Sequence, residues 1–253
     1  MTRPVYLLYG AVAYLIFFAT FLYLIGFVGD LPGLPRTVDR GPEASLAAAL
    51  TVDGALIALF GLQHSVMARQ GFKAAWTRIV PKPVERSTYV IFASLTLIVM
   101  FLFWRPIPAL IWEMNGAGAA ILWALFALGW AIVLASTFLI NHFELFGLRQ
   151  VWANMRGGEI PGPVFRQPFF YRLVRHPLYA GFFIAFWATP RMTAGHLLLA
   201  AGMSVYMLIA IRYEERDLVH LFGADYEDYR RDVGMLTPRL RRRARPTGLR
   251  SSP

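Results

Sequence analysis

Long uncharged runs recur along the chain, and their length predicts membrane-spanning helices. The first run, residues 4–29, contains 26 residues without a charge. At about 1.5 Å per helical residue it exceeds the roughly 30 Å hydrocarbon layer of a membrane. It is also longer than the apolar core of a signal peptide, so we expect it to be retained. Three further runs are typical of spanning helices, namely residues 44–68 (interrupted only by Asp53 and His64), 87–104 and 114–141.

The carboxy-terminal half predicts a shorter pair of apolar helices. Residues 177–190 form an uncharged run of 14 residues, which covers only about 21 Å as a helix. After Arg191 a second run, residues 192–211, is long enough to span. We expect a tight hairpin that turns at residues 189–191, with a short or tilted first limb. The predicted fold is all-α, a single-domain polytopic membrane helix bundle over residues 1–253 with about six segments, five of them full spans.

An amphipathic helix is predicted after the last span. Phe222, Tyr226, Tyr229 and Val233 recur at helical spacing, and charged residues occupy most of the positions between them. Such a helix either lies on the membrane surface or folds back over the helix ends as a lid. Residues 239–253 follow as a basic tail, and anionic lipid headgroups are its expected partner.

The composition supports a membrane protein and excludes several chemistries. Of 253 residues, 57% are hydrophobic and 16% are charged, whereas a soluble domain carries about 25% charged residues. The absence of cysteine excludes disulfides, thiolate metal sites and a covalent mechanism that uses an enzyme thiol. A net charge of +10 is compatible with nucleic acid, but basic cytoplasmic loops give the same charge. We expect no nucleic-acid partner.

Six crossings divide the basic residues very unevenly between the two sides of the membrane. One side collects 21 Lys and Arg residues, and the other receives only 4. The positive-inside rule places the richer side in the cytoplasm. We therefore expect both termini and the amphipathic helix to be cytoplasmic.

This topology brings the unusual polar residues to one face. Ionisable residues at helix ends that face a bundle interior are functional candidates in membrane proteins. A lone interfacial histidine is also a common hydrogen-bonded anchor, and a glutamate pair at a helix end is often simply solvated. Several such sites on one face favour a pocket. The residues concerned are His64, Asn141, His142, Arg175, His176, Glu214 and Glu215.

Two motifs near the carboxy terminus carry a family resemblance. The string RHPLYAG at residues 175–181 resembles the RHPxYxG element of the isoprenylcysteine carboxyl methyltransferase and phospholipid methyltransferase superfamily. The second half of that signature is similar to Glu214 and Glu215, then Tyr226 and Tyr229, then Pro238 and Arg239. The resemblance implies that residues of about 165–240 bind S-adenosylmethionine.

Two upstream strings extend the resemblance over most of the chain. NHFELFGLRQVW at residues 141–152 and QHSVMAR at residues 63–69 are similar to the methanethiol S-methyltransferases, a bacterial family of this superfamily. That likeness implies methyl transfer from S-adenosylmethionine to methanethiol, giving dimethyl sulfide. It also implies a bacterial inner-membrane location, a small-molecule thiol substrate and no obligate protein partner.

The residues of the motif suit the chemical groups of the methyl donor. Arg175 and His176 can hold its carboxylate, and Glu214 or Glu215 can accept from the ribose hydroxyls or the ammonium. Tyrosine rings can face the adenine and the sulfonium, although Tyr226 and Tyr229 also fit a role as interfacial aromatics. The expected cofactor-binding set is Arg175, His176, Tyr179, Gly181, Glu214, Glu215, Tyr226, Tyr229 and Arg239.

The thiol substrate raises the question of its proton, because an alkyl thiol is mostly protonated near neutral pH. His64 and His142 are candidate bases, and Tyr89 is a further catalytic candidate. Thiolate formed before binding is the alternative. We expect substrate contacts from Asn141, Glu144, Arg149 and Trp187. No metal is expected, since alternate positions such as His142 and Glu144 point apart on a helix.

Two other functions remain open from the sequence. A methyltransferase acting on a prenylated cysteine carboxylate or a phospholipid amine shares the carboxy-terminal motif but needs a long lipid-accessible groove. A non-enzymatic membrane protein of the related nitrogen-oxide metabolism group can keep the fold without the reaction.

Overall fold

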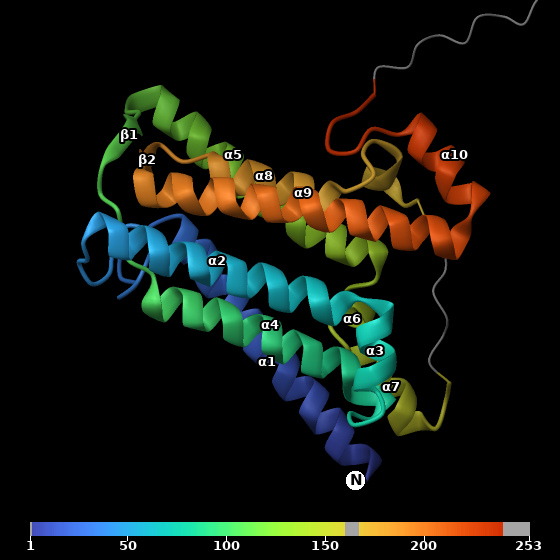
Figure 1. Ribbon diagram of the computed structural model, residues 1–253. Coiled ribbons are helices and arrows are strands. Elements are labelled where there is room, and N and C mark those ends of the chain that lie inside the picture. The colour runs from blue at the N-terminus through green and yellow to red at the C-terminus, as the bar shows by residue number, and fades with distance from the viewer. Residues whose placement is uncertain (1, 160–166, 240–253) are drawn as a thin grey trace, which may run out of the picture.

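The computed structural model describes residues 2–159 and 167–239, and it is a bundle of long apolar helices (Figure 1). Within these described residues, five helices are long and apolar enough to cross a membrane, and a sixth apolar helix, α8, is shorter. The all-α polytopic fold and the short limb are thus confirmed. The six are α1 (Arg3–Val28), α2 (Leu46–Ala68), α4 (Lys82–Phe103), α5 (Gly116–Ile140), α8 (Pro177–Trp187) and α9 (Ala194–Phe222).

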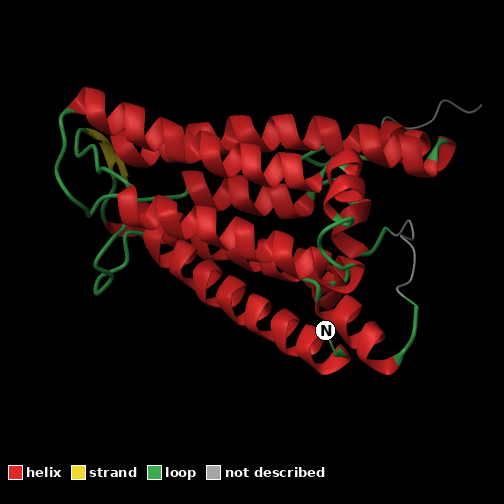
Figure 2. Ribbon diagram, turned by 60° about the horizontal axis from the view of Figure 1, so that its bottom comes forward, coloured by secondary structure: helices red, strands yellow, loops and turns green. Residues whose placement is uncertain are grey.

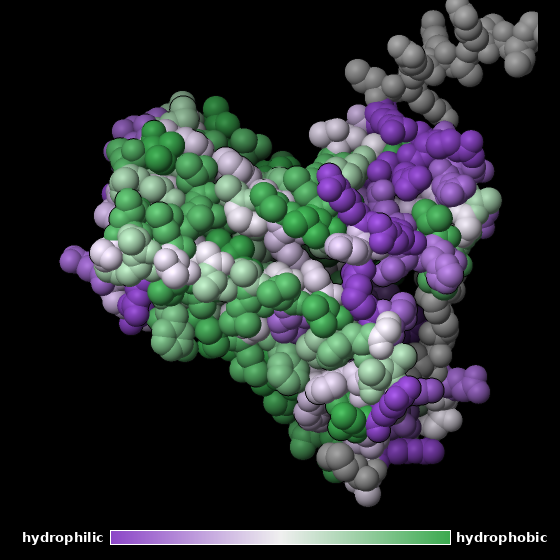
Figure 3. Space-filling view, viewed as in Figure 1, coloured by the Kyte–Doolittle hydropathy of each residue, from purple (hydrophilic) through white to green (hydrophobic). Residues whose placement is uncertain are grey.

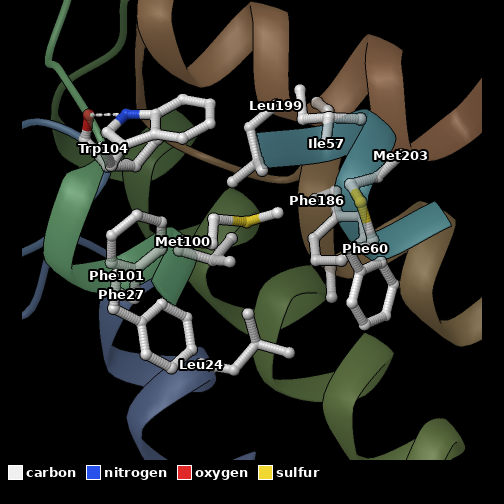
Figure 4. Close-up of a cluster of buried hydrophobic side chains, with 14 of the residues drawn as sticks. Leu24, Phe27, Ile57, Phe60, Met100, Phe101, Trp104, Phe186, Leu199 and Met203 are labelled. Carbon is white, nitrogen blue, oxygen red and sulfur yellow. Dashed lines mark hydrogen bonds between the residues drawn. The ribbon is translucent and has the colours of Figure 1, made fainter. Parts of the chain in front are cut away.

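The bundle consists of two groups of three helices, α1 with α2 and α4, and α5 with α8 and α9 (Figure 1). They meet along α2 and α9 around one apolar core. Figure 4 shows Phe27, Phe101, Phe186 and Met203 within it. The indole Nε1 of Trp104 donates to the carbonyl of Val38 at 3.0 Å, which satisfies the polar atom of a fully buried ring.

Two glycines allow α5 and α8 to pack very closely. A Cβ atom at Gly181 would lie 2.7 Å from the carbonyl oxygen of Gly129, and one at Gly129 would lie 2.7 Å from the amide of Ala185. Small residues permit such contact between helices that have no hydrophobic driving force between them in lipid. Gly181 of the RHPLYAG string therefore has a clear packing role.

One end of the bundle carries a small sheet that the sequence did not predict. Strand β1 (Leu110–Glu113) pairs antiparallel with β2 (Arg191–Thr193). The connection between α8 and α9 is therefore not the tight turn that we expected, because it contains strand β2. The indole of Trp112 also donates to the carbonyl of Thr189 at 3.0 Å. This pairing joins segments about 80 residues apart, and local sequence patterns do not report contacts at that range.

The opposite end, here called the basic end, carries the short helices (Figures 1 and 2). Hydrophilic residues gather over it, and hydrophobic residues cover most of the flanks of the long helices (Figure 3). The short helices are α3 (Gln70–Trp76), α6 (His142–Leu145), α7 (Leu148–Arg156), the 3-10 helix η1 (Phe169–Arg172) and α10 (Ala224–Asp232).

The last long helix continues past the apolar run 192–211 and past the helix end predicted at Glu214 and Glu215. Helix α9 runs to Phe222, so Glu214 and Glu215 lie within the helix. The chain turns at Gly223, whose φ of 57° favours glycine. In α10, Tyr226 and Tyr229 are buried, so the amphipathic helix folds back over the helix ends. Most of the predicted basic tail, residues 240–253, lies outside the described residues.

Candidate functional site

A cavity of about 670 Å³ opens at the basic end between the two helix groups. Its walls come from α1, α2 and α4 on one side and from α5, α8 and α9 on the other, and residues of α3, α6 and α10 line its end. The structure thus brings together residues that are far apart in the sequence. The sequence-predicted residues that line this cavity are His64, Tyr89, His142, Arg175, His176, Tyr179, Glu214, Tyr226 and Tyr229.

Glu215 joins the two halves of the carboxy-terminal signature. Its Oε1 accepts from Nε of Arg175 at 2.7 Å and lies 3.0 Å from Nε2 of His176. All three side chains are almost completely buried. A buried carboxylate held by two donors is well compensated, whereas removing one donor leaves an expensive charge. This cluster therefore fixes the start of α8 against the middle of α9.

Arg175 also fixes the segment after α10. Its Nη1 donates to the carbonyls of Arg230 and Val233. Its backbone N–H donates to the carbonyl of Gly234 at 2.8 Å, and that of His176 donates to Met235 at 3.1 Å. Three of the five guanidinium N–H donors, the one on Nε and the two on Nη1, are thus used within the protein. The remaining nitrogen, Nη2, is the part that can still serve the predicted carboxylate contact.

Tyrosines and a glutamate line the α8–α10 wall of the cavity. The hydroxyl of Tyr179 donates to Oε2 of Glu214 at 3.1 Å, and that of Tyr229 donates to the carbonyl of Tyr171. Burial raises the pKa of Tyr226, and it raises the pKa of Tyr229 to about 12. Both phenols are therefore neutral near pH 7, so they bring aromatic rings rather than negative charge to this wall.

His142 lies just beyond α5, and both of its ring nitrogens are in hydrogen bonds. Nδ1 is 2.8 Å from Oγ1 of Thr137, and Nε2 is 2.8 Å from the hydroxyl of Tyr14. Thr137 gives its only proton to the carbonyl of Leu134 at 2.7 Å, so it must accept from Nδ1–H. Nε2 then accepts from Tyr14. Burial lowers the pKa of His142, consistent with this neutral tautomer.

His64 has a different environment on α2. Its ring lies among aromatic rings, with centroids 5.2 Å from Phe60, 5.1 Å from Tyr89 and 6.2 Å from Tyr206. Its Nδ1 atom is buried and has no hydrogen-bond partner within residues 2–159 and 167–239. Of the two candidate bases, His64 is therefore the one with an uncommitted ring nitrogen.

Several predicted residues lie outside the cavity lining. Oε2 of Glu144 accepts from Nδ2 of Asn141 at 2.7 Å and from Arg149, and this cluster holds the turn between α5 and α7. The indole of Trp187 donates to Ser204 at 3.0 Å and ties α8 to α9. Exposed Arg239 donates to the carbonyl of Arg231. Their predicted ligand contacts stay predictions.

No group of three or more His, Cys, Asp or Glu residues that could hold a metal ion occurs in the described part of the chain. The polar side chains that line the cavity include imidazoles, phenols, carboxylates and guanidinium groups.

Sequence comparison identifies close relatives of known name. The chain is 54% identical to methanethiol S-methyltransferase of Mycobacterium tuberculosis over 239 residues, which cover 94% of this chain and 98% of the relative. It is 52% identical to the enzyme of that name from Crocosphaera subtropica, with 94% and 93% covered. The chain belongs to the methanethiol S-methyltransferase family.

More distant matches place this methanethiol S-methyltransferase family member in a wider group. Residues 54–242 match the NnrU protein family. Human nurim is 29% identical over 212 residues, covering 76% of this chain and 79% of nurim. No solved structure matches the chain at a significant level.

Two cavity residues of this family member were missed by the sequence reasoning. Tyr206 on α9 and Arg86 on α4 both line the cavity. Arg86 lies three positions before Tyr89, so both share one face of α4; that spacing is the signal that could have identified it. Tyr206 is one of many aromatic residues in an apolar run, and nothing in its local sequence distinguishes it.

Proposed function

We propose that the protein transfers the methyl group of S-adenosylmethionine to methanethiol, giving dimethyl sulfide, at the cytoplasmic face of the membrane. The observation that carries this proposal is the family membership, together with a single cavity that is lined by both halves of the carboxy-terminal signature. A methyltransferase needs a methyl donor, and the residues of this cavity fit S-adenosylmethionine well.

The cavity has a suitable size and lining for this donor. Sites for ligands of this size occupy about 300–1,000 Å³ and are mostly apolar, with a few placed polar groups. Here aromatic rings surround Glu214, and the neutral phenols of Tyr226 and Tyr229 lie on the same wall. Tyr179, Glu214, Tyr226 and Tyr229 would hold the donor, while Arg175, His176 and Glu215 would position that wall. S-adenosylmethionine supplies a sulfonium methyl group that a nucleophile can displace.

The protein's residues then have to align the thiol and remove its proton. Displacement at a methyl group is in line, so the thiol sulfur must approach from the side opposite the donor sulfur, which requires precise positioning and exclusion of water. His64, His142 and Tyr89 are the catalytic candidates on the opposite wall. Neutral imidazole can accept the proton. Of the two histidines, His64 has an Nδ1 atom without a hydrogen-bond partner in the described residues. Thiolate that forms before binding is the other route.

The orientation in the membrane follows from charge and from the donor. The basic end collects most of the Lys and Arg residues, and the positive-inside rule assigns such an end to the cytoplasm. The cavity opens at this end, where a polar, water-soluble methyl donor is available.

A headspace assay tests the function directly. Membranes that contain the protein are sealed with methanethiol and methyl-labelled S-adenosylmethionine, and labelled dimethyl sulfide is measured in the gas phase. We expect label in dimethyl sulfide with the wild type and a large loss with Glu214→Gln, while Glu227→Gln on the exposed face of α10 stays active. Label in a lipid or in prenylcysteine methyl ester, or no labelled product at all, would refute the proposal.

A further inference from the structure

Arg86 is a cation on the α4 wall of the cavity with an unusual anchor. Its Nε donates to the backbone carbonyl of Leu145 in α6 at 2.7 Å. The guanidinium carbon lies over the ring of Tyr89, 5.1 Å from its centroid. Cation–π contact and a single backbone bond fix the orientation of the group. Among the described residues, they leave the two terminal nitrogens, with four N–H donors, available to a ligand in the cavity.

The other cavity arginines already have carboxylate partners. Arg69 is 3.1 Å from Asp217, and Arg175 is 2.7 Å from Glu215. Arg86 has no carboxylate within 4.0 Å among the residues that the structure describes. A positive charge at a cavity wall without a counter-charge attracts an anion into the cavity.

Lys73 of α3 provides a second positive charge at the same place. Burial is the main cause that lowers the pKa of Lys73, and the positive charge of Arg86 is the second. Two like charges thus share this corner of the cavity, where α3, α6 and the ends of α2 and α4 converge (Figure 1). The buried Nδ1 atom of His64, which lacks a partner in the described residues, lies near the same corner. The corner is therefore positively charged and has an unsatisfied polar atom.

We propose that Arg86 holds the sulfur of the thiol substrate as its thiolate. This inference rests on the proposed function. The donor-binding groups lie on α8, α9 and α10, whereas Arg86 lies on α4, in the facing wall. An in-line displacement requires the nucleophile on the side of the methyl group away from the donor sulfur. The aromatic rings of Phe60 and Tyr89 beside this corner also suit a small apolar alkyl group.

The reaction balances without an enzyme base. The thiol gives its proton to water, and Arg86 stabilises the thiolate that remains. A thiolate lone pair forms the new carbon–sulfur bond, and the electron pair of the broken bond goes to the donor sulfur. The products are dimethyl sulfide and S-adenosylhomocysteine, both uncharged at sulfur. A protonated imidazole at His64 would be repelled by Arg86, so the same charge that favours thiolate capture disfavours proton transfer to His64.

Several titratable and charged groups surround this corner, and each of them can contribute to the pH dependence of turnover. They are His64 of α2, Arg69 between α2 and α3, Lys73 of α3, Glu85 and Tyr89 of α4, His142 of α6, and Tyr206, Glu214 and Asp217 of α9.

The first test is the rate of dimethyl sulfide formation against pH. At saturating methanethiol we expect kcat of Arg86→Gln to fall by roughly 10- to 100-fold at pH 7, because the bound thiol loses the charge that favours its ionised form. The defect should shrink above pH 10, where the thiol ionises without help. Arg86→Lys should retain part of the activity, and Arg78→Gln, an exposed arginine outside the cavity, should match the wild type.

Two results of this test would overturn the inference. An equal loss at every pH, with a lowered unfolding midpoint, would mean that Arg86 only anchors Leu145. Weaker S-adenosylmethionine binding in Arg86→Gln, measured by calorimetry, would mean that the guanidinium holds the donor carboxylate instead.

A second test counts protons and does not need turnover. Methanethiol is titrated into the protein saturated with S-adenosylhomocysteine, in two buffers of different ionisation enthalpy at pH 7.5. We expect release of about one proton per thiol bound to the wild type and much weaker binding to Arg86→Gln. Binding without proton release would overturn the inference. Proton-releasing, Arg86-dependent binding in a protein that forms no dimethyl sulfide would refute the proposed function alone.

Discussion

At the scale of single residues, the two cavity histidines illustrate how hydrogen bonds divide the candidates for one role. His64 and His142 both come near the same ends of their helices, so the sequence gives no reason to prefer either. In the structure Thr137 and Tyr14 engage both nitrogens of His142, while Nδ1 of His64 has no partner in the described residues. A histidine fixed in this way contributes to the shape of the cavity and to stability.

The neutral state of His142 predicts a pH-dependent stability. Its pKa in the folded protein lies below the 6.5 of a free imidazole, so the unfolded chain binds the proton more tightly. The contribution of His142 is therefore complete above about pH 6.5 and is lost as the pH falls towards its folded pKa. Thermal unfolding in detergent should show a lower midpoint at pH 5.5 than at pH 7.5, with a smaller difference in His142→Gln. An identical pH response of both proteins would contradict this assignment.

At the scale of elements, the docking of α10 depends on one buried ion cluster. Glu215→Gln removes the charge that Arg175 compensates, and loss of one member of a buried pair typically costs about 3–5 kcal/mol. We expect α10 to detach locally, so that trypsin cleaves near Arg230 and Arg231 faster and S-adenosylmethionine binds more weakly. His196→Ala is the control, because His196 packs away from the cavity against the carbonyl of Phe186. Unchanged proteolysis and donor binding in Glu215→Gln would show that α10 is held by other contacts.

The contact between α5 and α8 gives a second test at this scale. Gly181→Ala places a methyl group 2.7 Å from the carbonyl oxygen of Gly129, and overpacking of this kind costs about 1–3 kcal/mol. Gly54→Ala is a matched control on α2, since a Cβ there meets nothing within 4 Å. The unfolding midpoint should fall in Gly181→Ala and stay constant or rise in Gly54→Ala. Equal midpoints for both variants would show that the helices separate without cost.

At the scale of the whole molecule, the arrangement in the membrane is the main remaining prediction. The 21 to 4 division of basic residues predicts that a reporter fused after Gly116 and one fused after the carboxy terminus lie on opposite sides of the membrane. A reporter after Lys73 should agree with the carboxy terminus. If the Gly116 and carboxy-terminal reporters share a side, an even number of crossings separates them. The six-crossing topology, which places α5, α8 and α9 between them, is then wrong.

The sequence predicts the long helices well because hydrophobic length is a local property. The run at residues 87–104, for example, corresponds to the apolar part of α4. It does not predict the pairing of Leu110 with Thr193, or that of Val174 with Gly234, because these depend on the folded chain. The same limit applies to the site.

Arginines show this limit most clearly. Arg149 and Arg86 both lie at the basic end. In the folded chain Arg149 forms an ion pair with Glu144, whereas Arg86 lines the cavity and has no carboxylate partner in the described residues. The motif residues Arg175 and Glu215 could be found from sequence, but their mutual contact could not. Sequence therefore identifies the residue types of the site, and the packing assigns their partners.

The pairing of residues 174–176 with residues 234–235 also has a consequence for biosynthesis. The segment that closes the α8–α10 wall of the cavity follows all six apolar helices in the chain, so it is synthesised after them. A chain that ends before residue 230 therefore contains all six apolar helices but lacks the contacts that complete this wall. The last folding step takes place at the water-facing surface rather than in lipid.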